Sequence, residues 1–308
     1  MTMSGPAPVT VVVLTRNEAR NLAACLDSVR EWAHDVFVVD SGSTDGTVVL
    51  AEAAGATVVV HPFETHTRQW RWALDTLPIR TEWILALDAD QRVTPELRAS
   101  IAATLAGFQS RETAGYFVNR RQIFRGRWIR HGGYYPKYLL KLFRRDAVAL
   151  DDRDLVDHHF AVNGAVSRLA GDLIEDNHNE RAIAEWTAKH NRYAVLQARQ
   201  EILATLNRER VPMSALFGHT DARTMWLKQQ WARLPLFVRP CFYVFYRYVL
   251  RAGFLDGREG FVFHVLQGFW YRLLVDINIA EQHEALVEAP VDVDATLHAP
   301  AHHDAGKS

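Results

Sequence analysis

The feature that most constrains the fold is a repeated alternation, in the first third of the chain, of short apolar runs with segments typical of helices. The apolar runs lie at 9–14, 36–39, 57–60 and 83–87, and the helix-like segments at 17–30, 47–54 and 64–77. Runs without an apolar–polar alternation are typical of strands buried on both faces. Their order predicts a Rossmann-like, mostly parallel α/β sheet built from right-handed crossover units and flanked by helices.

Polar side chains follow three of these predicted strands at the point where each strand ends. They lie at 15–18, at 40–45 and at Asp88-Ala89-Asp90. Ligands of open α/β sheets bind at the carboxyl ends of the strands. We therefore expect these three segments, which are far apart in sequence, to line one pocket.

The third of these segments has the chemistry of a cation site. Asp88 and Asp90 are alternate residues at a strand end, so both carboxylates can contribute to one ion, and hard oxygen ligands suit Mg²⁺ or Mn²⁺. An ion that bridges two phosphates would neutralise the charge that grows on a departing nucleoside diphosphate. Two aspartates alone would equally suit a solvated turn, but the polar ends of the neighbouring strands favour the metal site.

The other two strand ends have two open interpretations each. Asp40, Ser41, Gly42 and Ser43 offer a carboxylate, hydroxyls and a flexible backbone that could bind a base or a ribose. The same segment could be only a turn that caps the next helix. The segment 15–18 could likewise cap a helix or contact the base.

Three segments together resemble the signature of family 2 glycosyltransferases. They are 9–18, 38–47 and 87–90. Within that family the chain is most similar to the bacterial branch that includes lipopolysaccharide core β-glucosyltransferases. Weaker similarity continues at 141–145, 171–174 and 253–257. The resemblance implies a GT-A fold, a nucleoside-diphosphate sugar donor and inversion at the anomeric carbon.

The resemblance also implies roles for single residues. Asp90 would be the direct ligand of a divalent metal, Mg²⁺ or Mn²⁺, and Asp88 would contact the metal or the ribose. Asp40 would contact the base. The complete set of donor-binding candidates is Thr15, Asn17, Glu18, Asp40, Ser41, Gly42, Ser43, Gln69, Arg71 and Asp88.

The catalytic base is left open by the sequence. An inverting transfer needs a carboxylate or imidazole within hydrogen-bond reach of the acceptor hydroxyl. Related sequences have a His-Glu pair in a loop, but the matching stretch here reads Leu-Val-Asp-His-His at 155–159, so the glutamate is absent. The candidates are Asp157, His158, Glu175 and Asp176, with Asp157 slightly favoured.

A second region, roughly 226–280, is dense in aromatic residues and arginine. On a regular helix Arg239, Arg247 and Arg251 would share one broad sector, opposite an aromatic face. This pattern is typical of a helix that lies in the bilayer interface with its arginines on anionic phosphates. The alternative is an ordinary helical subdomain packed on the catalytic core.

These observations predict a domain organisation. Residues 1–180 form a GT-A catalytic domain, with a nucleotide-sugar half at about 9–110 and an acceptor half at about 111–180. Residues 181–285 form a helical, aromatic-rich, membrane-associating extension, and 286–308 form a disordered tail.

The composition limits partners and location. The net charge of −1 over 308 residues gives no overall field that would favour nucleic acid. The chain shows neither a secretory signal nor an apolar run of about 18 residues. We expect a peripheral protein on the cytoplasmic face of the inner membrane, with a nucleoside-diphosphate sugar, a lipid-linked or glycolipid acceptor and the anionic membrane surface as partners.

Two other functions remain possible at this point. Sugar nucleotidyltransferases share a related sheet, but they usually have a glycine-rich basic loop where this chain has 15–18, which lacks glycine. A catalytically weak or inactive membrane-bound scaffold of a polysaccharide assembly complex is the second alternative, because the expected base glutamate is missing.

Overall fold

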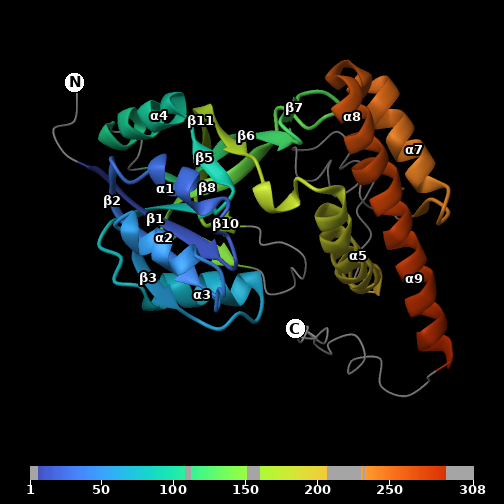
Figure 1. Ribbon diagram of the computed structural model, residues 1–308, viewed down its shortest axis with the longest axis horizontal. Helices are drawn as coiled ribbons and strands as arrows, with labels where there is room; N and C mark the ends of the chain where they lie inside the picture. Colours follow the sequence, from blue (N-terminus) through green and yellow to red (C-terminus); the bar gives the residue numbers. More distant parts are fainter. Residues whose placement is uncertain (1–5, 108–111, 151–159, 207–229, 232, 289–308) are drawn as a thin grey trace.

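The computed structural model describes residues 6–107, 112–150, 160–206, 230–231 and 233–288, and its main element is a nine-stranded sheet (Figure 1). The strands are β1 (Ala7–Thr15), β2 (Ala33–Asp40), β3 (Thr57–Val60), β4 (Trp83–Asp88), β5 (Gln91–Val93), β6 (Thr113–Phe124), β7 (Arg127–Ile129), β8 (Tyr138–Arg144) and β11 (Ala165–Glu175). Their order is β3-β2-β1-β4-β8-β6-β11-β5, and β7 pairs with β6.

Most strands of the sheet run in one direction. β1, β2, β3 and β4 are mutually parallel, and β6 and β11 share their direction, whereas β5, β7 and β8 run the opposite way. In-register pairing aligns Thr15 with Asp40 and Leu14 with Asp88, so three strand ends meet at one edge. This arrangement confirms the predicted GT-A-type α/β sheet.

The core explains why the strands are apolar on both faces. Val9, Val11 and Val13 point to the face covered by α1 (Leu22–Asp27), α2 (Thr47–Ala53) and α4 (Pro95–Ala106). Val12 points to the opposite face, which is covered by α3 (His66–Thr76) and a hairpin of β9 (Val148–Leu150) and β10 (Phe160–Val162). These valines are fully buried, and each contributes about 1.5–3 kcal/mol by leaving water.

The first helix is shorter than the sequence pattern predicts. The apolar stripe suggested 17–30, but α1 spans only Leu22–Asp27. Asn17 has a left-handed backbone with φ of 56°, and its amide donates to Ser43 Oγ at 2.8 Å. Side-chain bonds to the loop after β2 therefore compete with helical bonds and delay the start of the helix.

A helical region lies beside one end of the sheet (Figure 1). It contains the short 3₁₀ turn η2 (His178–Glu180), α5 (Ile183–Leu206), α7 (Arg239–Phe245), the π-helix η4 (Tyr246–Leu250), the 3₁₀ turn η5 (Gly253–Asp256), α8 (Gly257–Phe263), the π-helix η6 (His264–Trp270) and α9 (Tyr271–Glu288). α5 and α9 pack through an apolar core. None of the helices in the described ranges is both long and apolar enough to span a bilayer.

The prediction that Arg239 faces lipid phosphates is wrong. Its side chain is only 2% exposed, and its Nε donates to Asp276 Oδ1 at 2.7 Å. Nη2 of the same guanidinium donates to Glu201 Oε2 at 3.2 Å. Arg239 therefore ties α7 to α5 and α9, which is a structural role inside the helical region.

Candidate donor and metal site

The Asp40 side chain organises the loop that follows β2. Its Oδ1 accepts hydrogen bonds from Thr15 Oγ1 at 3.0 Å and Ser43 Oγ at 2.5 Å. Its Oδ2 accepts from the amides of Gly42 at 3.0 Å and Ser43 at 2.7 Å. Four acceptor positions saturate a carboxylate. A base could therefore bind Asp40 directly only by replacing one of these bonds.

The loop after β1 is joined to the Asp40 loop and to η2. Asn17 Oδ1 accepts from the amide of Thr44 at 2.8 Å, and the amide of Glu18 donates to Thr47 Oγ1 at 2.8 Å. Glu18 Oε2 accepts from Asn21 and Asn179 at 2.7 and 3.1 Å. Burial raises the pKa of Glu18, and nearby carboxylates add to this effect. The first two strand ends thus form one hydrogen-bonded unit.

Gln69 is a bridge between the ends of β2 and β3. It is 1% exposed, and its Nε2 donates to Ser41 Oγ and to the carbonyl of His61, both at 3.2 Å. Its Oε1 lies 2.8 Å from Nδ1 of His61, whose ring stacks on Trp72. The structure thus places Gln69 beneath the loop that carries Ser41.

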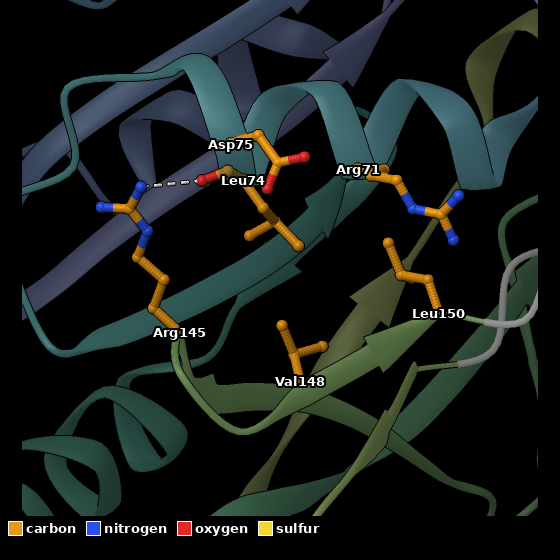
Figure 2. Close-up of a pocket in the computed structure, with 6 residues that line it drawn as sticks. All are labelled: Arg71, Leu74, Asp75, Arg145, Val148 and Leu150. Carbon is orange, nitrogen blue, oxygen red and sulfur yellow. Dashed lines mark hydrogen bonds between the residues drawn. The ribbon is translucent and has the colours of Figure 1, made fainter.

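Arg71 lies on α3, two residues after Gln69. It lines a cavity of about 380 Å³ together with Leu74, Asp75, Arg145, Val148 and Leu150. Figure 2 shows Arg71 reaching from α3 toward Leu150 of β9. Arg145, on the far side of this cavity, donates to the carbonyls of Leu74 at 2.9 Å and Ile79 at 3.1 Å. Arg71 therefore borders a cavity between α3 and β9, and its role toward the donor stays a prediction.

Asp88 is held by a buried lysine. Lys141 Nζ lies 2.8 Å from Asp88 Oδ2, and the lysine side chain is 5% exposed while the aspartate is 42% exposed. The amide of Asp88 donates to Gln91 Oε1 at 3.2 Å. The ion pair fixes one carboxylate oxygen and leaves the group accessible at the edge of the sheet.

Asp90 lies among other carboxylates. Burial raises its pKa well above the ordinary value, and the negative charges of Glu175 and Asp88 raise it further. The amide of Asp176 donates to the carbonyl of Asp90 at 3.1 Å, so the end of β11 lies directly beside it. Negative charge is therefore crowded at this point, which favours binding of a cation.

The two acidic candidates at the end of β11 are both engaged. Glu175 accepts from Arg120 Nη1 at 2.9 and 3.1 Å and from Gln91 Nε2 at 2.9 Å. Asp176 pairs with Arg92 at 2.8 Å and with His178 at 3.1 Å. The other two base candidates, Asp157 and His158, lie outside the described residues, so they stay predictions.

The donor set fits a hard cation only as part of a larger site. Asp88 and Asp90 offer carboxylate oxygens, which suit Mg²⁺ or Mn²⁺. In the ranges that the structure describes, no group of three or more His, Cys, Asp and Glu side chains is arranged to hold a metal. The protein ligands would therefore be completed by phosphate oxygens or water, as is usual for Mg²⁺.

Three basic side chains of this site were not predicted from the sequence. They are Lys141 on β8, Arg120 on β6 and Lys189 on α5. Burial lowers the pKa of Lys189, but Tyr193 and the Glu180 carboxylate outweigh this and raise it overall. A lysine within the apolar run 138–143 was a usable signal for Lys141, whereas nothing local distinguishes Lys189 from a surface residue.

The family model described as "Glycosyl transferase family 2" matches residues 10–164, about half of the chain. A lipopolysaccharide core biosynthesis glycosyltransferase, LpsC of Rhizobium meliloti (strain 1021), is 29% identical over 206 residues, which cover 63% of this chain and 72% of the relative. An uncharacterized glycosyltransferase of Rickettsia bellii (strain RML369-C) is 40% identical over 93 residues, 30% of this chain, and the match spans 31% of that relative's length.

Among solved structures, mannosyltransferase PcManGT from Pyrobaculum calidifontis, in complex with GDP-Man and Mn²⁺, is similar over 91% of this chain and 90% of its own, with 14% identity and a TM-score of 0.46. The family match and the strand-end site agree, and the chain belongs to glycosyl transferase family 2.

Proposed function

We propose that this chain is an inverting, metal-dependent hexosyltransferase that moves a sugar from a nucleoside-diphosphate sugar to a lipid-linked, lipopolysaccharide or exopolysaccharide acceptor. The observation that carries the proposal is the meeting of Asp88, Asp90 and Glu175 at one edge of the sheet. Gln91 bonds to both the Asp88 amide and the Glu175 carboxylate, the Asp176 amide donates to the Asp90 carbonyl, and the pKa of Asp90 is raised. A divalent cation at this edge would relieve the repulsion between the carboxylates and attract a diphosphate.

The metal would be held by Asp90 directly and by Asp88 as a second ligand or as the partner of the ribose. When bound, Mg²⁺ or Mn²⁺ would supply positive charge to the departing nucleoside diphosphate. Lys141 keeps the Asp88 carboxylate oriented through its 2.8 Å contact. The loops at Asn17 and Ser43, bonded to each other, would form the wall for the nucleoside.

The base is one of Asp157, His158, Glu175 and Asp176. Glu175 is supported by its place beside Asp90, whose pKa its charge raises, while Arg120 contacts both of its oxygens. Asp157 and His158 belong to the segment between β9 and β10, and they are candidates on the grounds given by the sequence.

The acceptor is proposed to be borne by a membrane. The exposed large apolar side chains of 234–261, here called the apolar face, are Leu234, Phe237, Val238, Phe242, Phe245, Tyr246, Val249, Leu250, Phe254, Leu255 and Phe261. Among the described residues from 234 to 250, no charged side chain is exposed. Exposed apolar side chains that gather in one segment of a chain are typical of a membrane or protein contact. The similarity to LpsC supports a lipopolysaccharide-type acceptor.

We further propose that residues 1–180 act as the catalytic domain and 181–285 as the membrane-associating region. The protein would then be peripheral on the cytoplasmic face of the inner membrane, where its apolar face enters the interface. Activated sugars are available on that side.

The proposal is tested by following release of nucleoside diphosphate from a panel of donors, with metal present and after chelation. We expect chelation to abolish release and Mn²⁺ or Mg²⁺ to restore it. Asp90→Asn should lower release by about a hundredfold or more, as expected for a metal ligand. Asp27→Asn is the matched control, because its carboxylate is 61% exposed and its ion pair, with Arg30, lies on the surface. Full release by Asp90→Asn would refute the metal role.

A further inference from the structure

Two arginine side chains meet at a glycine turn between the sheet and the helical region. A Cβ at Gly133 would lie 3.7 Å from both Nε and Nη2 of Arg251 and 3.8 Å from Nη2 of Arg247. The turn is fixed to the helices, because the amide of Gly132 donates to the carbonyl of Arg251 at 2.9 Å. The two guanidiniums are therefore held on the same side of Gly133.

Neither guanidinium has an anionic partner in the described part of the chain. Arg247 donates to the hydroxyl of Tyr243, and its guanidinium carbon lies 3.9 Å from the ring centroid of Tyr134. Its Nε is buried and makes no hydrogen bond there. Aromatic rings attract a cation but do not neutralise it. Two like charges without a counterion are costly, and such local conflicts are typical of functional sites.

The ionisable neighbours do not compensate this charge. The carboxylate of Asp256 is 2% exposed and is occupied by His131, whose amide and ring nitrogen lie 2.8 and 2.6 Å from its two oxygens. Burial and the charge of Arg247 lower the pKa of His264 to about 4, so this imidazole is neutral at physiological pH. The local field at Gly133 is therefore positive.

The position of the pair indicates where an anion would come from. Arg251 directly follows Val249 and Leu250, and it precedes Phe254 and Leu255, all of which belong to the apolar face. On the other side, Arg247 packs over the ring of Tyr134, and the charge of Arg120, which holds Glu175, also acts on the Tyr134 hydroxyl. The pair thus stands between the surface proposed to enter a bilayer and the proposed catalytic edge.

We propose that Arg247 and Arg251 form a binding site for the phosphate of a lipid-borne molecule at the rim of the apolar face. Guanidinium groups bind phosphate through short, charge-assisted hydrogen bonds, and two of them can share one phosphate. The inference deepens the proposed function, since it assigns an anionic group to the membrane-borne acceptor. It rests on that function only for the identity of the acceptor.

The test is co-sedimentation of the full chain with phosphatidylcholine vesicles that contain about one-fifth phosphatidate, compared with phosphatidylcholine alone. We expect phosphatidate to strengthen binding, and Arg251→Gln to weaken the binding to phosphatidate vesicles about tenfold. Arg258→Gln, an exposed arginine of α8, is the matched charge control and should lose less than twofold. Equal losses for both variants would overturn the site in favour of general charge attraction.

A second pair of variants avoids removing an arginine. Gly133 has φ of +77°, a conformation that Asp and Asn tolerate better than other side chains. Gly133→Asp places a carboxylate beside both guanidiniums and should weaken phosphatidate binding about as much as Arg251→Gln. Gly133→Asn has the same shape without the charge and should retain binding. Equal retention by both variants would contradict the proposal.

Soluble inorganic pyrophosphate distinguishes a site for a lipid phosphate from a site for a free, soluble phosphate. If it stabilised the chain against heat through Arg251 while phosphatidate added nothing to vesicle binding, the lipid source would be refuted. The assays contain neither donor sugar nor metal. Failure of the phosphate site is therefore distinguishable from failure of the proposed catalysis, which is read from the Asp90→Asn variant.

Discussion

Two regions of the molecule are opposite in charge. One is the strand-end site, which contains Asp88, Asp90 and Glu175, and the other is the Gly133 junction, where Arg247 and Arg251 meet at the glycine turn. At the strand ends, the carboxylates of Asp88, Asp90 and Glu175 crowd together, and the pKa of Asp90 is raised. At the junction, Arg247 and Arg251 converge, and the pKa of His264 is lowered. At the junction neither guanidinium has an anionic partner among the described residues, whereas at the strand ends Asp88 is paired with Lys141 and Glu175 with Arg120. We propose that each region binds a ligand of the opposite charge, a cation at the strand ends and a phosphate at the junction.

The largest expected effect concerns the base at the strand-end site. Removing a general base typically lowers turnover by about 10²–10⁴-fold. We expect one of Asp157→Asn, His158→Gln, Glu175→Gln or Asp176→Asn to show this loss in kcat with acceptor present, while donor binding is kept. Steady-state kinetics with each variant decide between them. Full turnover in all four would remove every candidate and weaken the catalytic account of this region.

Substituting one glycine in each region tests how tightly the two regions are packed. Gly42 and Gly132 both have a left-handed backbone, with φ of +79° and +67°. A Cβ at Gly132 would lie 2.0 Å from Cε1 of His264, whereas Gly42 has open space within 4 Å. We expect Gly132→Ala to cost about 3 kcal/mol of unfolding free energy and Gly42→Ala about 1 kcal/mol. Urea unfolding measures both, and equal costs would show that the junction is loosely packed.

The junction should also be sensitive to acid. His264 has a pKa of about 4 in the folded chain against 6.5 as its ordinary value. As the pH falls from about 6.5 to 4, His264 takes up a proton in the unfolded chain but not in the folded chain, so the free energy of unfolding decreases. The loss is about 3 kcal/mol. His264→Gln should have a flatter curve of unfolding free energy against pH in this range, and identical slopes would contradict a neutral buried His264.

The smallest expected effect is a gain in stability at the strand-end site. Because the pKa of Asp90 is raised in the folded chain, its ionisation costs stability as the pH rises above about 4. Without metal, Asp90→Asn should therefore be more stable than the natural chain at neutral pH, by about 1 kcal/mol. The gain should shrink as the pH falls toward 4. A loss of stability at neutral pH would mean that the carboxylates are not in conflict.

The meeting of the three strand ends could be predicted from sequence because its signals are local. Apolar strands that end at Asp40 and at Asp88 pair in parallel with β1, which brings their carboxyl ends together. Lys141 and Lys189 reach the same edge from β8 and α5. Their roles depend on how distant elements pack, which periodicity does not encode.

The junction was harder to predict. The prediction that Arg239, Arg247 and Arg251 share one sector assumes 3.6 residues per turn. However, η4 is a π-helix, which has more residues per turn, so side chains after it point in other directions than on a regular α-helix. Arg239 packs inward on Asp276 instead. Likewise, Asn17 is not part of the predicted first helix, because its amide and side chain bond to Ser43 and Thr44, about 26 residues away.

We propose that Asp90 and Asp88 hold a divalent metal against the diphosphate of a sugar donor. Thermal unfolding with a panel of nucleoside-diphosphate sugars, with and without Mn²⁺, tests it most directly. We predict that one donor raises the unfolding temperature of the natural chain only when Mn²⁺ is present, and that Asp90→Asn abolishes this shift. Stabilisation by a donor that is equal without Mn²⁺, or that survives Asp90→Asn, would contradict the claim.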